Sequence, residues 1–161
     1  FTDGKQEIIL ASERGQAIRF KENAVREMGR AARGVIGMRL RKDDRVVGMA
    51  QGEAGRELLT VTEFGLGKRT PLGQYRLQSR GGSGVKNIRL TPKTGRVVAV
   101  RSVREEDEIL IVTARGIVSR LSVKEIATQG RAAQGVRLKR LDEGDRVSAI
   151  APIAGREDGE E

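Results

Sequence analysis

The feature that most constrains this fold is a pattern that occurs three times along the 161-residue chain. The stretches EIILASERGQAIRF (7–20), ELLTVTEFGLGKRT (57–70) and EILIVTARGIVSRL (108–121) align with one another, and so do the segments that follow them. The first and third copies align without a gap, and the middle copy needs one extra residue within 91–95. The residues identical in all three copies are, in first-copy numbers, Glu7, Gly15, Arg19, Arg30, Gly34, Val35, Arg39, Leu40, Arg45 and Val46. Self-similarity at a period of about 50 residues indicates a repeat architecture.

Each copy predicts four short strands. In the first copy these are expected at 8–12, at 16–20, from residue 35, and at 46–50. The X-Gly pair at Arg14-Gly15 is the signal for a tight hairpin between the first two strands. Four strands in a repeat of about 45 residues are typical of a β-propeller blade. We therefore expect an all-β, propeller-like fold with three four-stranded blades, and a stacked solenoid is the alternative.

The charge of the chain indicates a polyanionic partner. Lys and Arg number 31 against 22 Asp and Glu, for a net charge of +9. Four of the acids lie within 157–161, so the preceding body carries 31 bases against 18 acids, a balance of +13. Nucleic acid is the first candidate and an anionic membrane the second. Aromatic residues make up only 2% of the chain, which favours backbone contact with a duplex over base stacking with a single strand.

Composition also excludes several classes of chemistry. The chain has no Cys and no His, which removes disulfides, thiol catalysis, Cys/His zinc sites and His-based acid–base mechanisms. We expect no catalytic residues, no metal and no cofactor. No apolar run approaches the ~20 residues of a membrane span and no signal peptide is visible, so an intracellular, cytoplasmic origin is expected. The first residue is Phe1 rather than Met, which suggests a piece of a longer protein.

Three glycine-rich loops lie at equivalent places: GRAARG (29–34), SRGGSG (79–84) and GRAAQG (130–135). Their small central residues leave backbone N–H groups open to a phosphate. The arginine at the second position, Arg30, Arg80 or Arg131, can add a bidentate phosphate contact, or can instead pin the loop to a neighbouring carbonyl. Both interpretations stay open here. The closing glycines are expected mainly to supply a positive φ.

Other basic positions divide by whether they recur. Arg19, Arg69 and Arg120 face Glu7, Glu57 and Glu108 across the predicted hairpins, so a cross-strand ion pair is preferred to DNA contact for this set. Lys68 has Ile18 and Ser119 as its counterparts, and it is predicted to be an extra surface base. Arg33 and Lys86 are also specific to one copy and are candidates for contact. Tyr75 is expected to be a partly buried loop anchor.

The segments 17–40, 67–91 and 130–147 closely resemble the C-terminal domain of gyrase A, a component of DNA gyrase, and the resemblance covers about residues 5–152. It implies a β-pinwheel, a six-bladed propeller variant whose blades exchange strands, which binds and bends duplex DNA around a basic rim. The diagnostic box of that family is Gln-Arg-Arg-Gly-Gly-Lys-Gly. Residues 78–84 match it except at Ser79 and Ser83, which replace two basic residues.

The resemblance further implies a domain organisation. The chain corresponds to the last three blades, a single unit over 1–154 with repeats at about 7–51, 57–102 and 108–152, followed by an acidic disordered tail at 155–161. Three blades cannot close a six-blade ring, so either a partial ring or self-association through open blade edges is expected.

The same resemblance implies a role in ATP-dependent negative supercoiling. Its partners would be double-stranded DNA, gyrase B and the remainder of gyrase A, with the catalytic residues outside this chain. The alternatives are the C-terminal domain of the A-type protein of topoisomerase IV and a protein-interaction propeller. The candidate DNA-binding residues are Arg30, Arg33, Lys68, Arg69, Gln78, Arg80, Gly81, Gly82, Gly84, Lys86 and Arg131.

Overall fold

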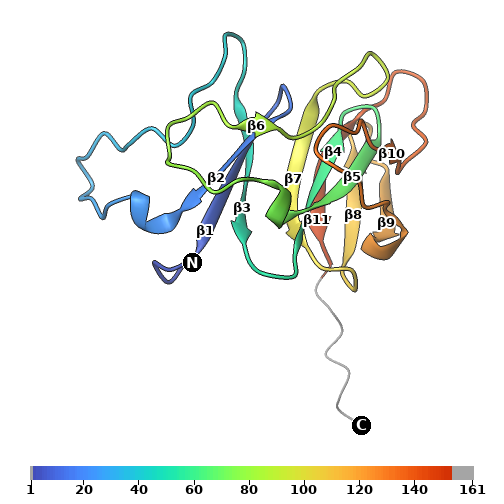
Figure 1. The fold of residues 1–161 in the computed structure, drawn as a ribbon. Helices are drawn as coiled ribbons and strands as arrows, with labels where there is room; N and C mark the ends of the chain where they lie inside the picture. The colour runs from blue at the N-terminus through green and yellow to red at the C-terminus, as the bar shows by residue number, and fades with distance from the viewer. Residues whose placement is uncertain (1, 154–161) are drawn as a thin grey trace.

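The computed structural model describes residues 2–153, which form antiparallel β-sheets and three single-turn 3-10 helices (Figure 1). The strands are β1 (Glu7–Ser12), β2 (Gln16–Lys21), β3 (Val46–Gly52), β4 (Glu57–Thr62), β5 (Leu66–Pro71), β6 (Val85–Lys86), β7 (Val97–Val103), β8 (Glu108–Thr113), β9 (Val118–Ser122), β10 (Val136–Arg137) and β11 (Val147–Pro152). The 3-10 helices are η1 (Glu22–Ala24), η2 (Leu72–Gln74) and η3 (Val123–Glu125). The all-β, propeller-like prediction is therefore confirmed. Over the same range of residues, none of the helices has the length and apolar character needed to span a bilayer.

The centre of each sheet is a hairpin: β1 with β2, β4 with β5, and β8 with β9. Each hairpin turns at a glycine in the left-handed region, with φ of 85° at Gly15, 83° at Gly65 and 84° at Gly116. Only glycine adopts this conformation without a steric penalty, which is why the X-Gly pairs predicted the turns correctly.

The outermost strand of a sheet comes from the next repeat. The first sheet has the order β3-β1-β2-β6, and β6 pairs Val85 with Ala17 of β2. The second has the order β10-β5-β4-β7, and β10 pairs Val136 with Gly67 of β5. The second and third repeats thus each supply three strands to their own sheet and donate a short fourth strand to the sheet before it, which confirms the strand exchange expected of a β-pinwheel.

Two details of the prediction are wrong. The third sheet, β11-β8-β9, has three strands, and the residues that follow Gly34 form no strand. Strand exchange explains both departures. Residues 35–36 correspond to β6 and β10, which pair with a preceding sheet, and β9 corresponds to β2 and β5, which accept a strand from a following repeat. The described residues contain no repeat before the first or after the third.

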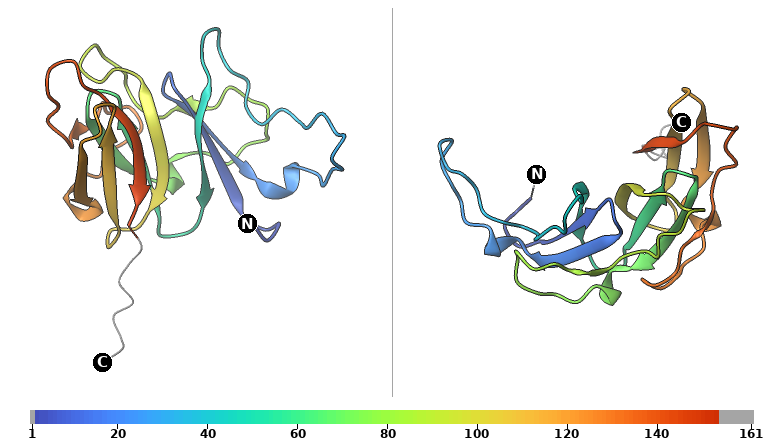
Figure 2. Two further views of the ribbon diagram at one scale, coloured as in Figure 1. Left: turned by 180° about the vertical axis from the view of Figure 1, so that it is seen from behind. Right: turned by 90° about the horizontal axis from the view of Figure 1, so that it is seen from above.

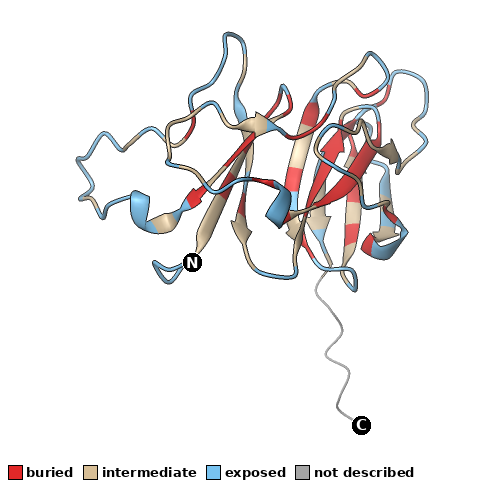
Figure 3. Cartoon of the chain, viewed as in Figure 1, coloured by how far each residue is buried: buried red, intermediate tan, exposed pale blue. Residues whose placement is uncertain are grey.

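The hydrophobic core lies between neighbouring sheets. One cluster joins the first and second sheets and includes Ile9, Leu58 and Val100, while another joins the second and third and includes Leu59 and Ile109. Adjacent residues of β4 point to opposite faces, so Leu58 and Leu59 serve different clusters and both are fully buried. Figure 3 shows this concentration of buried residues on β4 and β5 in the middle of the molecule.

The three sheets follow an arc. Strands β3, β7 and β11 pack against one another in sequence, β3 on β7 and β7 on β11. The right-hand view of Figure 2 places them on the inner side of the arc, with the connections that carry β6 and β10 on the outer side. We call this outer side the rim. The glycine-rich loops lead directly into β6 and β10, so they belong to the rim.

Candidate nucleic-acid interface

The second and third glycine-rich loops rest on the sheet of the preceding repeat. A Cβ at Gly84 would overlap the Ala17 carbonyl oxygen, and one at Gly135 would lie 2.7 Å from that of Gly67. Both glycines also have a positive φ, 76° and 89°, as expected from the sequence. Gly34 has the same conformation, with φ of 80°, but open space around it. The closing glycine thus sets the turn in every copy and allows close contact where a sheet lies beneath.

Arg80 and Arg131 pin their loops to carbonyls of the preceding repeat. Arg80 donates from Nε to the Ala24 carbonyl at 2.9 Å and from Nη1 to that of Ile36 at 3.0 Å. Arg131 donates from Nη1 to the carbonyl of Lys86, the counterpart of Ile36, at 3.0 Å. The pinning role is therefore present at both positions. A guanidinium has five N–H donors, so each side chain keeps donors for a second partner.

The rest of the second loop is held by backbone hydrogen bonds. The Gln78 N–H donates to the Arg19 carbonyl at 2.9 Å, and the Gly81 N–H donates to that of Gly37 at 2.6 Å. The Gly82 carbonyl accepts the N–H of Arg39 at 2.8 Å. Within the described residues, the Gln78 side-chain nitrogen Nε2 is buried and has no hydrogen-bond partner. Gln78, Gly81 and Gly82 therefore shape the loop from inside, and the Gln78 amide nitrogen does not face solvent.

Lys68 does not lie on the surface, so the prediction of an extra exposed base is wrong. Its exposed fraction is 0%, and Nζ donates to the Gly130 carbonyl at 2.5 Å. The reason is its place on β5, which lies between β4 and β10 and is covered by the segment leading into the third loop. Burial first, and the positive charge of Arg131 second, lower the pKa of Lys68 to about 8.

The recurrent arginines of the hairpins are ion-paired as predicted. Arg69 is buried, bonds Glu57 through Nη1 at 2.8 Å, and donates from Nε to the Ile126 carbonyl at 2.7 Å. Arg19 and Arg120 pair with Glu7 and Glu108. Because its guanidinium is enclosed by these partners, Arg69 is a structural residue beneath the rim.

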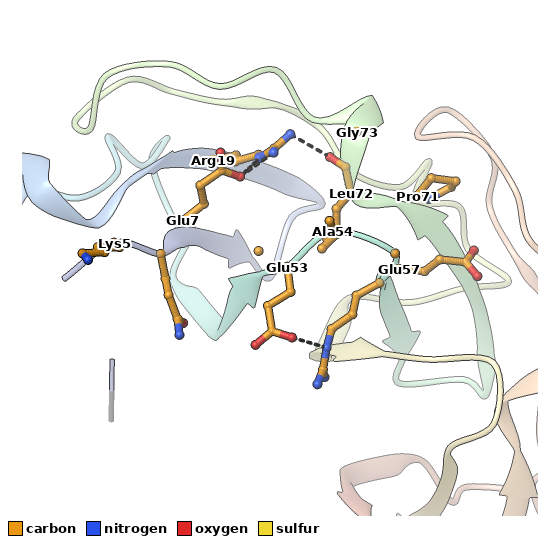
Figure 4. Close-up of a pocket in the computed structure, with 13 residues that line it drawn as sticks. Lys5, Glu7, Arg19, Glu53, Ala54, Glu57, Pro71, Leu72 and Gly73 are labelled. Atoms are coloured by element: carbon orange, nitrogen blue, oxygen red, sulfur yellow. Dashed lines mark hydrogen bonds and ion pairs between the residues drawn. The ribbon is translucent and has the colours of Figure 1, made fainter. Parts of the chain in front are cut away.

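One surface cleft has mixed charge. It lies between the first two repeats and is lined by Glu7, Arg19, Glu53, Arg56 and Glu57, among others (Figure 4). Arg19 reaches across it to the Leu72 carbonyl at 3.2 Å, and Arg56 pairs with Glu53 at 2.9 Å. Since Arg19 and Arg56 are paired with the carboxylates of Glu7 and Glu53, these two arginines are not free cations for a polyanion.

The remaining candidates are exposed. Arg30 and Arg33 lie on the first loop, and Lys86 lies on β6. Within residues 2–153, no hydrogen bond or ion pair engages the side chains of these three residues. They are cations free to meet a partner at the rim.

Comparison with known proteins agrees with this geometry. A family model described as DNA gyrase C-terminal domain, beta-propeller, matches residues 6–51, 56–104 and 107–154. The chain belongs to the DNA gyrase C-terminal domain family. It is 43% identical over 159 residues to the gyrase A protein of Staphylococcus epidermidis and 44% identical over 162 residues to that of Staphylococcus aureus. These alignments cover 98% and 99% of this chain but 18% of each relative.

Solved structures give the same result for the fold. A DNA gyrase A C-terminal domain superposes with a TM-score of 0.89 at 30% identity, covering 95% of this chain and 52% of that one. The C-terminal domain of a DNA topoisomerase IV superposes equally well, with a TM-score of 0.89 at 25% identity, covering 94% and 48%. The chain therefore spans about half of a solved domain of this kind.

In this member of the gyrase C-terminal domain family, the structure adds a set of residues to the candidate site. Arg39, Arg89 and Arg140 are identical in the three repeats and exposed in all of them. Over the described range, their side chains make no hydrogen bond or ion pair. The backbone N–H groups of Arg39 and Arg89 donate to Gly82 and Ala133 of the next loop, at 2.8 and 3.1 Å. The signal was in the repeat itself: these arginines recur without a recurring carboxylate, unlike Arg19 with Glu7.

Proposed function

We propose that this chain binds duplex DNA along its rim and bends it around the arc, through phosphate contacts that are largely independent of sequence. The observation that carries the proposal is the set Arg39, Arg89 and Arg140, a free cation at the same place in each described repeat of a curved molecule. A cation that the fold neither pairs nor buries, yet places three times along one curve, fits a partner with regularly spaced negative charge. The phosphate backbone of DNA is such a partner.

The other rim residues divide into contacts and supports. Arg30, Arg33 and Lys86 are exposed and act as further phosphate contacts. Arg80 and Arg131 hold their loops with some N–H donors and offer the remainder to phosphate. The backbones of Gly81, Gly82 and Gly84, which have no side chains, allow a phosphate to come close to the loop. Lys68, Arg69 and Gln78 act from beneath by holding the loops in place.

Energetics permit a bent path. Bending a short duplex by tens of degrees costs on the order of 1–6 kcal/mol. Hydrogen bonds to charged groups contribute about 1.5–3 kcal/mol each, so a few such contacts offset the bend. Because the cations of the rim follow a curve, a bent duplex can contact all of them, whereas a straight duplex cannot.

The wider role follows from the gyrase A relatives, of which this chain spans about a fifth. Within such a protein, the chain would hold a DNA segment so that the ATP-driven enzyme passes it with fixed handedness and introduces negative supercoils. Strand cleavage and ATP hydrolysis would come from the rest of gyrase A and from gyrase B. The place of action would be the cytoplasm, on the nucleoid.

The open strand edges make a second copy of the chain a further partner. In the two complete junctions, Ala17 pairs with Val85 and Gly67 with Val136. The third acceptor, Val118, is 56% exposed, and the unpaired donor segment around Ile36 is 63% exposed. A second copy of the chain can therefore place its residues 35–36 against β9 in the same register.

The direct test of the proposed function is titration of a fluorescently labelled duplex at low and moderate salt. For phosphate contacts, log affinity falls with log salt by about 0.9 per phosphate neutralised. Arg89→Ala should reduce the slope by about that amount, because it removes one rim cation. Arg101→Ala, which removes an exposed arginine from inner strand β7, should leave the slope unchanged. No binding of the folded chain at low salt would overturn the proposal and leave a protein-interaction propeller as the better interpretation.

A further inference from the structure

Lys68 connects the second sheet to the loop of the third repeat. Its ammonium group donates to the Gly130 carbonyl at 2.5 Å, and Gly130 directly precedes Arg131. Two positions along the same strand, the Thr70 hydroxyl donates to the Gln129 carbonyl at 2.8 Å. Two side chains of β5 thus hold consecutive carbonyls at the entrance to the 130–135 loop. Both attachments lie within two residues of Arg131.

The surroundings of Lys68 do not neutralise its charge. Thr60 lies opposite it on β4, and the segment that covers it contributes the cation Arg131. The nearby phenol of Tyr75 is neutral, because burial raises its pKa well above the usual value. The neighbouring Arg69–Glu57 pair lies on the other face of β5, since adjacent strand residues point to opposite sides. Within the described residues, neither Lys68 nor Arg131 makes an ion pair, so no carboxylate compensates these two charges.

The fold does not require a lysine at this place. The counterpart of Lys68 in the first repeat is Ile18, which is also fully buried. At the junction of the first two repeats, the counterparts of Lys68 and Lys86 are Ile18 and Ile36, so neither place holds a lysine. A buried lysine costs desolvation free energy that isoleucine does not. The charge is thus a special property of the junction between the second and third repeats.

We propose that Lys68 is a positioning residue for the 130–135 loop, and that DNA binding at this loop is accompanied by uptake of a proton on Lys68. This inference rests on the proposed function. A phosphate beside Arg131 brings the negative charge that the junction lacks, and so favours the charged form of Lys68. In the free chain, Lys68 with a pKa of about 8 is partly deprotonated at mildly alkaline pH. Binding raises this pKa, and a proton is taken up from solvent.

The composition of the chain makes this proton measurable. There is no His and no Cys, the two side chains that commonly titrate near neutral pH. Ordinary lysines titrate near 10.4 and stay charged at pH 8. The α-amino group, with an ordinary pKa of about 7.7–8.0, is present in every variant and cancels in a comparison. A difference between wild type and a Lys68 variant therefore reports on Lys68.

The experiment is isothermal titration calorimetry of the chain with a duplex at pH 8.0, in two buffers with different ionisation enthalpies. The wild type should take up as much as about half a proton per chain, since a group with a pKa of about 8 is half protonated at that pH. Its affinity should fall by up to about tenfold between pH 7 and pH 9, because the contribution of the protonated form is lost as pH rises. Lys68→Met should lack both effects.

Two further variants separate charge from structure. Lys68→Arg keeps a cation that does not titrate in this range, so it should bind at pH 7 like the wild type and keep that affinity at pH 9. Ser119→Ala changes the equivalent position of the third repeat and should leave proton uptake intact. Binding of DNA by the wild type with equal enthalpies in the two buffers would overturn the inference while the proposed function stands. Proton uptake that is as large in folded Lys68→Met or Lys68→Arg as in the wild type would also overturn it, whereas absence of DNA binding by the wild type would refute the proposed function itself.

Discussion

At the scale of single residues, Glu13 ties two repeats together. It is buried at the end of the first hairpin and pairs with Arg45 of its own repeat and Arg96 of the second. Hydrogen bonds from Arg96 and Arg45 hold the pKa of Glu13 below its usual value, against the opposing effect of burial. One carboxylate thus links β3 and β7 at the point where the two sheets meet.

Replacement of Glu13 by Gln should destabilise the chain by about 1–2 kcal/mol, since it leaves the two arginines without their charged acceptor. The wild type should also lose stability in acid. A carboxyl with a lowered pKa in the folded state contributes stability above its unfolded pKa, and this contribution disappears as pH falls through the folded value. Urea denaturation between pH 7 and pH 3 measures both effects. Glu105→Gln, at an exposed turn, is the control, and an equal loss in that variant would contradict the assignment.

For single residues, the counterparts in the other repeats carry more structural information than the residue type alone. Lys68 was predicted to be an extra surface base because it occurs in one copy only, but its counterpart Ile18 already indicated that the position faces inward. The hairpin ion pairs were predictable, since Arg19 and Glu7 recur together. The acceptor of the Tyr75 hydroxyl, Asn87, was not predictable, because it comes from a segment that only the folded chain brings next to Tyr75.

At the scale of elements, local patterns predicted the strands but not the sheet to which each one belongs. Val85–Lys86 and Val136–Arg137 have the composition of any short strand, and their pairing with the preceding repeat is decided by contacts remote in sequence. The three-stranded third sheet follows from the same cause. Resemblance to a family with strand exchange supplied what the residues alone did not.

The closing glycines give a prediction at this scale. Gly84→Ala should cost about 3 kcal/mol or more, because its Cβ would overlap the Ala17 carbonyl oxygen in addition to the strain of a positive φ. Gly34→Ala has only the strain and should cost about 1–2 kcal/mol. Thermal denaturation of the two variants checks the difference. Equal losses would show that the approach of the loop to the sheet does not matter for stability.

At the scale of the whole molecule, the arc has complementary ends. One end exposes a donor segment and the other an acceptor strand, as described for residues 35–36 and β9. The solved gyrase A domain is about twice as long as this chain. Two copies joined end to end would therefore have the length of one such domain.

A cysteine pair tests this joining, because the chain has no cysteine of its own. By analogy with Ala17 and Val85, Val118 of one copy should lie opposite Val35 of another. The variant carrying Val35→Cys and Val118→Cys should form a disulfide-linked dimer under mild oxidation, detected on a non-reducing gel. The pair Ile36→Cys and Val118→Cys is the matched control, since a shift of one residue points the thiols to opposite faces. Similar yields from both pairs, or none from the first, would contradict strand donation in this register.

Strand exchange has a consequence for how such domains change in evolution. Both complete junctions here use the same pairing, a third-strand residue of one repeat against a second-strand residue of the repeat before it. If a repeat is duplicated or deleted, the repeats that become neighbours still meet through a donated third strand and an accepting second strand. The new junction therefore needs no new type of interface. The number of blades can therefore change by whole repeats while each junction keeps the same strand pairing. The length of the curved surface available to a ligand changes with it.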